Sequence, residues 1–262
     1  MNDRKSTRVV VTGAAGVMGE WISRAFARDG ADLLLHDLRP EPLAALADDL
    51  RRGGTAVGVT HGDLSQDEGL KQLVASISER WDSPDVLVNN AGVYPHAAIL
   101  DTDVAEVRRI FEINVMAPFA LSRAVAQLMQ RTRTAGSIIN ISSGAANAPA
   151  TGGGPYAASK AALQMLTRSF AIELAHSGIR VNSVQPGFAP GSVVSPLDDE
   201  YVARMTSTIP LGRTSGPHDA PEAVLFLASG RASFITGATL AVDGGRTAGK
   251  MVPPANPIPE EA

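Results

Sequence analysis

The chain has 262 residues, of which 44% are hydrophobic and 19% are charged, and its formal net charge is −4 at pH 7. That length is enough for one large α/β domain with a substantial core, and the mild negative charge gives no footprint for nucleic acid as a partner. The sequence contains no cysteine, which excludes disulfides and thiolate metal sites and fits a reducing compartment.

Apolar runs typical of β-strands alternate with helical patterns along the whole chain. The expected strands, in chain order, are residues 8–13, 32–37, 55–63, 85–92, 136–143, 179–187 and 238–245. The expected helices are residues 17–29, 40–52, 66–80, two stretches within 102–131, then 155–176 and 218–229. Strands that are apolar throughout belong to sheets buried on both faces, and strand–helix alternation implies right-handed crossovers. We therefore predict an α/β fold of Rossmann type: a doubly wound parallel sheet of about seven strands with helices on both faces.

The sequence predicts a single soluble domain followed by a short tail. No internal repeat or linker interrupts the alternation, so we expect residues 1–246 to form one domain. Residues 247–262 are Pro-rich and polar, and we expect an extended tail that is either loose or draped over a partner subunit. The apolar run near the N-terminus is too short and too interrupted for a signal peptide. The longest uncharged stretch, 134–159, is too rich in Ser, Asn, Gly and Pro for a membrane helix. We expect a cytoplasmic protein without a membrane partner.

A glycine-rich loop joins the first expected strand to the first expected helix. Gly13, Gly16 and Gly19 let the backbone turn tightly and approach a ligand, and the helix N-terminus offers free N–H groups to a pyrophosphate. The second expected strand ends at Asp37, eighteen residues beyond Gly19, where a dinucleotide fold places an acid against the adenosine ribose. An acid there repels a 2′-phosphate, so the sequence favours NAD over NADP, although Arg39 could soften that choice. The alternatives are a plain strand–helix turn and a strand-end acid.

The stretch "GGGPYAASKAAL" (152–163) places a phenol and a cation on one face of a helix. Tyr156 and Lys160 are four residues apart, about one helical turn. A lysine beside a phenol can lower the pKa of the phenol so that it moves protons near neutral pH. The alternative is a surface helix that carries both side chains by chance.

A series of motifs in a specific order resembles the short-chain dehydrogenase/reductase family over residues 6–246, in particular its single-domain branch. The motifs are "TGAAGVMG" (12–19), "GDLS" (62–65), "NNAG" (89–92), "INV" (113–115), "ISS" (141–143), "YAASK" (156–160), "RVNSVQPG" (180–187) and "ITGATLAVDGG" (235–245). Each is weak alone, but their joint order and spacing are specific. The resemblance implies the Rossmann-type fold expected above.

The resemblance also implies the roles of four catalytic residues. Tyr156 would be the general acid/base for a carbinol or carbonyl oxygen, and Lys160 would keep its charge beside it and bind the nicotinamide ribose. Ser143 would hydrogen-bond the substrate oxygen, and Asn114 would hold a water that links Lys160 to solvent. Ser142 is the rival of Ser143 and is expected to face inward at the strand end.

A nicotinamide site is implied in the same way, with NAD preferred and NADP less favoured. The residues implied to bind the cofactor are Gly13, Gly16, Val17, Met18, Gly19, Asp37, Leu38, Asp63, Leu64, Asn90, Ala91, Gly92, Tyr156, Lys160, Pro186, Gly187 and Ser192. No metal site is expected, because the five histidines lack the spacing of metal ligands.

The sequence departs from the family pattern at two places. Val17 stands where the middle glycine of the family's loop belongs, and Gly16 comes one residue early. This spacing resembles that of a longer branch of the family, the epimerases and dehydratases. That branch carries an added C-terminal substrate domain, for which this chain has no room. We interpret Val17 as the residue that opens the helix, and we hypothesise that it crowds the pyrophosphate. Gly191 stands where a threonine often contacts the nicotinamide carboxamide, and Ser192 could substitute for it.

These observations predict an NAD(H)-dependent oxidoreductase that interconverts a secondary alcohol and a ketone. The segments expected to line the pocket, 93–99, 144–155 and 188–212, hold few cations, which favours a small, neutral, fairly apolar substrate. The alternatives are a non-catalytic NAD-binding regulatory protein, a 3-oxoacyl-carrier-protein-type reductase, and an epimerase or dehydratase. Helix 155–176 is apolar over much of its surface; in the family this helix and one near 112–131 form subunit interfaces, so we expect a homotetramer, with a dimer as second choice.

Overall fold

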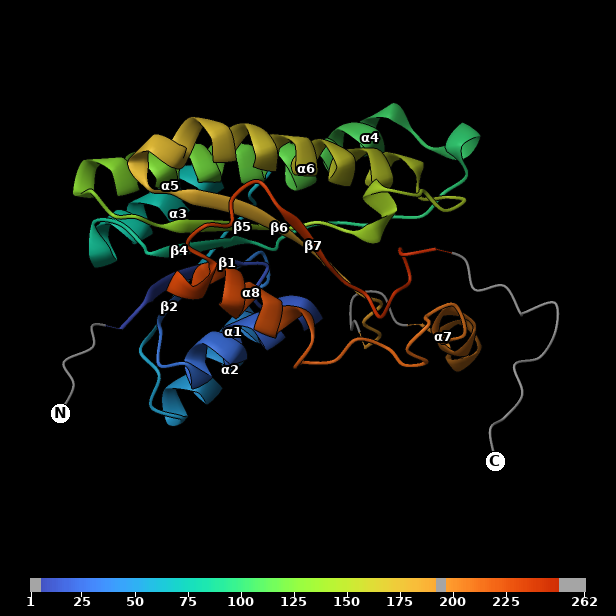
Figure 1. The fold of residues 1–262 in the computed structure, drawn as a ribbon, viewed down its shortest axis with the longest axis horizontal. Helices are drawn as coiled ribbons and strands as arrows, with labels where there is room; N and C mark the ends of the chain where they lie inside the picture. The colour runs from blue at the N-terminus through green and yellow to red at the C-terminus, as the bar shows by residue number, and fades with distance from the viewer. Residues whose placement is uncertain (1–5, 192–196, 250–262) are drawn as a thin grey trace.

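Runs of valine, leucine and isoleucine form the strands of one parallel sheet that is buried on both faces (Figure 1). The computed structural model describes residues 6–191 and 197–249. The strands are β1 (Arg8–Thr12), β2 (Asp32–Asp37), β3 (Val57–His61), β4 (Val86–Asn89), β5 (Ser137–Ile141), β6 (Arg180–Pro186) and β7 (Thr239–Val242). All seven predicted strands are confirmed, each with somewhat shorter ends or the same ends.

The strand order is β3-β2-β1-β4-β5-β6-β7, and every neighbouring pair is parallel. The chain runs outward from β1 to β3 and then returns to add β4 on the other side of β1. In sheets of this kind, ligands bind in the crevice beyond the carboxyl ends of the strands at the point where the order reverses. The doubly wound topology predicted from the sequence is confirmed, and it places the crevice next to the loops after β1 and β4.

Helices cover the two faces of the sheet in separate layers (Figure 1). Buried side chains of α1, α2 and α8 pack on one face, and those of α3, α5 and α6 pack on the other. The helices are α1 (Val17–Arg28), α2 (Pro40–Arg52), α3 (Asp67–Trp81), α4 (Val104–Phe111), α5 (Ala117–Thr132), α6 (Gly154–Leu174), α7 (Asp199–Thr206) and α8 (Ala220–Ala228). The two stretches predicted within 102–131 are α4 and α5, and a π-helical turn, η2 (Glu112–Met116), joins them.

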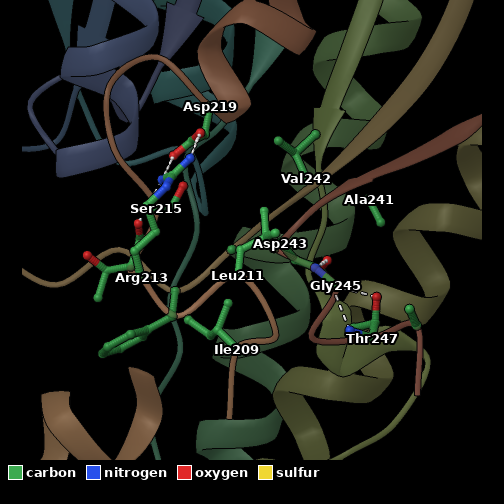
Figure 2. A pocket seen from close by; sticks show the side chains of 15 residues that line it. Ile209, Leu211, Arg213, Ser215, Asp219, Ala241, Val242, Asp243, Gly245 and Thr247 are labelled. Atoms are coloured by element: carbon green, nitrogen blue, oxygen red, sulfur yellow. Dashed lines mark hydrogen bonds and ion pairs between the residues drawn. The ribbon is translucent and has the colours of Figure 1, made fainter. Parts of the chain in front are cut away.

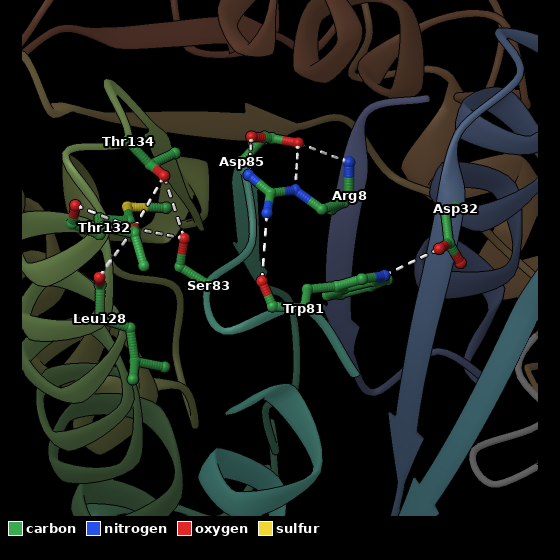
Figure 3. Close-up of polar contacts among 9 residues, drawn as sticks. Arg8, Asp32, Trp81, Ser83, Asp85, Leu128, Thr132 and Thr134 are labelled. Carbon is green, nitrogen blue, oxygen red and sulfur yellow. Dashed lines mark hydrogen bonds and ion pairs between the residues drawn. The ribbon is translucent and has the colours of Figure 1, made fainter. Parts of the chain in front are cut away.

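A polar cluster fastens the amino edge of the sheet, opposite to the crevice (Figure 3). The Arg8 guanidinium donates from Nε and Nη2 to the two carboxylate oxygens of Asp85, at 2.9 and 2.6 Å, and from Nη1 to the main-chain oxygen of Trp81. The Trp81 indole donates to Asp32 at 2.8 Å. Because Arg8 begins β1, Asp32 begins β2 and Asp85 precedes β4, these contacts tie the starts of three adjacent strands together.

Several predictions fall partly outside the described residues. The division into a domain of residues 1–246 and a tail of 247–262 stays a prediction, because 250–262 lie outside the part of the chain that the structure describes. Within the described residues, none of the helices combines the length and apolarity needed to span a membrane.

Candidate active site

Four side chains singled out in the sequence meet beyond the carboxyl ends of β4 and β5. Ser143 lies two residues past β5, Tyr156 lies in the first turn of α6, and Lys160 follows one turn later. The phenol of Tyr156 is hydrogen-bonded to Ser143, and the Lys160 ammonium lies 5.9 Å from the centre of the Tyr156 ring. Asn114 comes to the same place from η2 on the neighbouring strand connection.

Lys160 is buried, and its ammonium donates to a main-chain oxygen. Its side chain is 5% exposed, and Nζ donates to the carbonyl of Ile141 at 2.9 Å. Burial lowers the pKa of the Lys160 ammonium to about 8. A Cβ at Gly92 would stand 3.4 Å from Nζ and 3.1 Å from Oδ1 of Asn114. The glycine that ends "NNAG" therefore keeps the approach to Lys160 open.

The pKa of the Tyr156 phenol moves in the direction opposite to the one expected from the sequence. Burial is the largest influence and raises this pKa above its ordinary value, while the hydrogen bond with Ser143 lowers it to a smaller extent. Desolvation of the phenolate outweighs the effect of this hydrogen bond, and the lowering of the phenol pKa by Lys160 stays a prediction. Ser142 faces inward as predicted: it is 3% exposed and accepts from Gln164 at 3.0 Å.

Asn114 serves as a clamp between two segments, a role the sequence pattern does not reveal. Its amide nitrogen donates to the carbonyl of Val93 at 2.9 Å and to the Ser159 hydroxyl at 3.0 Å, and its Oδ1 accepts from the Val93 N–H at 2.9 Å. Ser159 in turn donates to the main-chain oxygen of Tyr156 at 2.7 Å. Both side-chain N–H groups of Asn114 are thus used within the protein. The expected water can only be held by an acceptor atom of this residue.

Two of the three loop glycines are required by their surroundings. Gly13 has a φ of 62°, and a Cβ there would stand 2.8 Å from Cα of Ala91; a Cβ at Gly19 would run into the carbonyl of Gly13. Gly16 has a φ of −85°, which any residue adopts, so its place in the motif is not explained by the turn. Val17 is the first residue of α1, as predicted.

The N-terminus of α1 fits a pyrophosphate. The N-cap residue is Gly16, and no side chain caps the helix there. The first amide N–H groups of a helix have no partner inside it, so an anion placed at this end can accept from them and also gains from the helix dipole. The close packing of Gly13 and Gly19 keeps side chains out of the same space. On these grounds the loop and helix suit the dinucleotide implied by the resemblance.

Asp37 and Arg39 are coupled to each other and to this loop. The Asp37 carboxylate, on a residue that is 5% exposed, accepts from the N–H of Ala15 at 2.9 Å and from Nε of Arg39 at 3.2 Å. Arg39 also donates from Nη2 to the carbonyl of Ala15 at 2.9 Å. Two opposite charges therefore lie together where the second strand ends, and both hold the loop in place. Leu38 between them is 63% exposed.

Other residues assigned to the cofactor set differ in whether their side chains are free to meet a ligand or are used to hold the loop. The Asn90 side chain donates to the carbonyls of Thr12 and Gly13, both at 3.0 Å, so it holds the loop rather than pointing into open space. Thr12, which the sequence analysis did not single out, accepts from the N–H groups of Asn90 and Ala91. The sequence feature that could have identified Thr12 is its position in the first motif, just before Gly13.

The turn after β3 and the end of β6 complete the set. Asp63 is exposed and accepts from the N–H of Ser65, whereas the Leu64 side chain is buried in the core, which leaves only its main chain for a ligand. Gly187 follows Pro186 at the end of β6 and donates to the carbonyl of Val242 at 2.8 Å. Ser192 lies outside the described residues.

A cavity of about 470 Å³ opens beyond the ends of β6 and β7 (Figure 2). Phe188, Ile209 and Leu211 line it, and the ion pair between Arg213 and Asp219 stands at one side. Neither Ser143 nor Tyr156 lines this cavity, but Gly187 of the cofactor set does, so the cavity adjoins the site at the end of β6. No group of three or more potential metal ligands occurs among the residues that the structure describes.

Comparison with known proteins places this geometry in context. The family model described as "Enoyl-(Acyl carrier protein) reductase" (adh_short_C2) matches residues 13–247. The trans-4-hydroxycyclohexanecarboxylate dehydrogenase of Sinomonas cyclohexanicum is 38% identical over 95% of this chain and 96% of its own length. The cyclopentanol dehydrogenase of Comamonas sp. (strain NCIMB 9872) is 39% identical over 92% of this chain and 96% of its own length.

A solved structure has the same fold as this chain over almost its whole length. It is a candidate NAD(P)-dependent gluconate 5-dehydrogenase from Beutenbergia cavernae with NADP bound at low occupancy. It superposes with a TM-score of 0.87 at 33% identity, covering 94% of this chain and 98% of its own. The similarity therefore extends to the strands and loops that carry the site described above.

Proposed function

This chain belongs to the short-chain dehydrogenase/reductase family, and we propose that it interconverts a secondary alcohol and a ketone on a small, neutral substrate, with NAD(H) as the cofactor. One observation carries the proposal: Ser143, Tyr156 and Lys160 converge at the carboxyl edge of the sheet, beside a helix N-terminus suited to a dinucleotide. A bound nicotinamide dinucleotide would supply or accept the hydride, and the protein would supply position and polarity.

Tyr156 would move the proton. In ketone reduction the phenol would give its proton to the carbonyl oxygen, and in alcohol oxidation the phenolate would take the hydroxyl proton. Ser143, already hydrogen-bonded to Tyr156, would hold the same substrate oxygen and stabilise the charge that develops there. Lys160 would bind the nicotinamide ribose and keep a positive charge near the phenol. Asn114 would hold the relay water through an acceptor atom and would fix the position of α6 through Ser159.

We propose NAD as the preferred cofactor because of Asp37. Its buried carboxylate lies beside the phosphate loop, where a 2′-phosphate would meet a negative charge. Arg39 offsets part of that charge, since its guanidinium contacts the same carboxylate. NADP is therefore disfavoured rather than excluded. The other residues of the cofactor set named from the sequence would also contact the dinucleotide.

The second candidate function is reduction of an acyl group carried on a protein, which the description of the matching family model favours. Such a substrate needs a basic docking surface. The candidates in the sequence are Arg108, Arg109, Arg131 and Arg133. Arg109 forms an ion pair with Glu106 at 2.7 Å, so its charge is partly neutralised and contributes less to such a basic surface. A small free substrate accounts better for these residues.

We propose a homotetramer, with a dimer as second choice, and a cytoplasmic location. Support for assembly comes from apolar side chains that α5 and α6 leave exposed: Phe119 is 38% exposed, Met165 59% and Ile172 80%. Exposed apolar side chains gathered on two adjacent helices are typical of subunit interfaces. The lack of cysteine fits the reducing cytoplasm.

The test of the proposed function separates cofactor binding from turnover. NADH binding is measured by fluorescence titration, and ketone reduction is followed by NADH absorbance, for the wild type and for Tyr156→Phe. We expect Tyr156→Phe to bind NADH within about twofold of the wild type and to lose at least about a hundredfold in kcat, because the phenyl ring keeps its packing but carries no proton. A wild-type protein that binds NADH but reduces no ketone would support the regulatory alternative.

A further inference from the structure

The loop after β4 is fixed at both of its ends beside Tyr156. At Val93 the Asn114 side chain binds both the main-chain N–H and the carbonyl, each at 2.9 Å. At Ala97 the main-chain N–H donates to the carbonyl of Gly152 at 3.0 Å. The residues between these two anchors are therefore held in one position relative to α6, whose first turn carries Tyr156.

Tyr94 lies between the anchors, and its ring contacts the ring of Tyr156. The ring centres are 6.4 Å apart, and the planes make an angle of 67°, an edge-to-face contact. Tyr94 is 47% exposed. Half of this aromatic side chain is thus open to solvent directly beside the residue proposed to move the proton. A substrate oxygen that reaches Tyr156 would bring the neighbouring carbon atoms against the exposed part of Tyr94.

The surroundings of this ring carry no charge that would bind a charged substrate. Residues 92–100 and 142–159, which include both sides of the contact between the two rings, contain no Lys, Arg, Asp or Glu. Ile99 lies over the start of α6, since a Cβ at Gly154 would stand 3.6 Å from its Cδ1. Lys160 comes next along α6 but is buried against Ile141. His96 is the one side chain of these two ranges that can become a cation, and a carboxylate beside Tyr94 would lose its hydration without gaining a permanently charged partner.

A second aromatic pair lies on the strand connection that follows. Phe188, two residues past β6, contacts Tyr201 of α7 with ring centres 6.2 Å apart. Since β4, β5 and β6 are neighbours and parallel, the loops after all three leave the same edge of the sheet. The acids at the start of α7, Asp198 and Glu200 among them, add negative charge on that side.

From this arrangement we propose that Tyr94 is a specificity-determining residue and that the substrate is an uncharged alicyclic alcohol or ketone. A saturated ring offers a rigid apolar face to the fixed aromatic wall and has no freely rotating bonds to freeze on binding. An acyclic alcohol of similar size covers less of the wall, and a ring that carries a carboxylate brings an uncompensated charge. This inference rests on the proposed function, since it concerns the substrate of the same site.

The experiment compares three alcohols on four proteins. The alcohols are cyclohexanol, 2-hexanol, which is acyclic and has the same number of carbon atoms, and 4-hydroxycyclohexanecarboxylate, with kcat and KM determined separately for each. The proteins are the wild type, Tyr94→Ala, Tyr94→Phe and Leu100→Ala. Leu100 is 95% exposed and lies in the same connection, so its variant is the matched control. The Kd for NADH and the melting temperature of each variant verify that the fold and cofactor site are intact.

The inference predicts that the wild type prefers cyclohexanol to both other alcohols. In Tyr94→Ala the KM for cyclohexanol should rise about tenfold or more, with little change in kcat and a smaller change in the reaction of 2-hexanol, because the lost contact is with the ring and not with the reacting oxygen. Tyr94→Phe should retain the preference, and Leu100→Ala should match the wild type.

Each other outcome is decisive. A wild type that oxidises these alcohols but prefers 2-hexanol or the carboxylate overturns the inference and leaves the proposed function standing. Equal losses on all alcohols in Tyr94→Ala, or no loss on any, also overturn the inference alone. A wild type that oxidises none of the three while binding NADH overturns the inference, and the proposed function then depends on the ketone assay described above.

Discussion

At the scale of single residues, burial decides the protonation of the site. It raises the pKa of the Tyr156 phenol and lowers the pKa of the Lys160 ammonium to about 8. Both groups therefore carry their protons at neutral pH. A protonated phenol is the form that reduces a ketone, whereas oxidation of an alcohol needs the phenolate and so gains from higher pH. These protonation states suit the proposed reduction of a ketone near neutral pH.

Asp37 supplies a prediction about the cofactor at this scale. Asp37→Asn keeps an oxygen to accept from the Ala15 N–H but removes the charge. The ratio of kcat/KM with NADP to that with NAD should rise about tenfold, since the repulsion of the 2′-phosphate is lost. Steady-state kinetics with both cofactors measures this ratio. Asp48→Asn, at an exposed position of α2 outside the cofactor set, serves as the control, and an unchanged ratio in Asp37→Asn would remove Asp37 as the source of preference.

His36 supplies a prediction about stability and pH. It is 2% exposed, its two ring nitrogens have no hydrogen-bond partner among the described residues, and burial lowers its pKa to about 4 despite the nearby Asp37. The unfolded chain, with a pKa near 6.5 for this group, then binds more protons than the folded chain below that pH, so stability falls as the pH falls from 6.5 towards 4.

The measurement is urea denaturation of the wild type and His36→Leu at pH 7.5 and pH 5. The wild type should lose about 2 kcal/mol more than the variant between these two pH values, because only the wild type carries the buried imidazole. Equal losses in the two proteins would mean that the imidazole is solvated or hydrogen-bonded in solution.

At the scale of the elements, the sequence patterns predicted the strands well and the junctions poorly. The runs Val9–Val11, Leu33–Leu35 and Val86–Val88 are buried from end to end and give an unambiguous signal. The π-helical turn around Asn114 has no such signal, because its contact with Val93 depends on how the α4–α5 junction meets the loop after β4. Contacts of this kind join distant segments and leave no local periodicity.

The same contrast holds within the candidate site. The inward position of Ser142 followed from the end of a strand, since neighbouring residues there face opposite ways. The pKa direction of Tyr156 did not follow, because the degree of burial around the phenol is a property of the assembled loops. Gly16 looked equivalent to Gly13 in the motif, and only the structure separates them, by their backbone angles and by the space open to a Cβ.

The contacts of Arg8 allow a test of the amino edge of the sheet. Arg8→Ala removes a two-pronged ion pair with Asp85 that is mostly shielded from solvent, and it should lower the free energy of unfolding by about 2 kcal/mol. Arg24→Ala, in a more exposed ion pair with Glu20, should cost less than about 1 kcal/mol. Urea denaturation measures both. NADH affinity should not change in either variant, and a loss of affinity in Arg8→Ala would contradict the separation of the two sheet edges.

At the scale of the whole molecule, one edge of the sheet is fastened and the opposite edge carries the chemistry. The outer surfaces of α5 and α6 expose the apolar side chains of Phe119, Met165 and Ile172. Ile172→Glu places a charge on the most exposed of these three side chains and should shift the protein from the proposed tetramer to smaller species, since a buried charge in an interface is costly. Light scattering after size-exclusion chromatography measures the mass. Leu100→Glu is the control, and an unchanged mass in Ile172→Glu would place the interface elsewhere.

The most direct test of the central claim follows the hydrogen itself. Cyclohexanone is incubated at neutral pH with NADH that carries deuterium at the transferable position, and the cyclohexanol formed is analysed by mass spectrometry. The account predicts one deuterium on the carbinol carbon with the wild type and almost no product with Tyr156→Phe, even though that variant still binds NADH. Labelled product formed equally well by Tyr156→Phe would contradict the role assigned to the phenol. An absence of labelled alcohol from a wild type that binds NADH would contradict reduction of an alicyclic ketone as its activity.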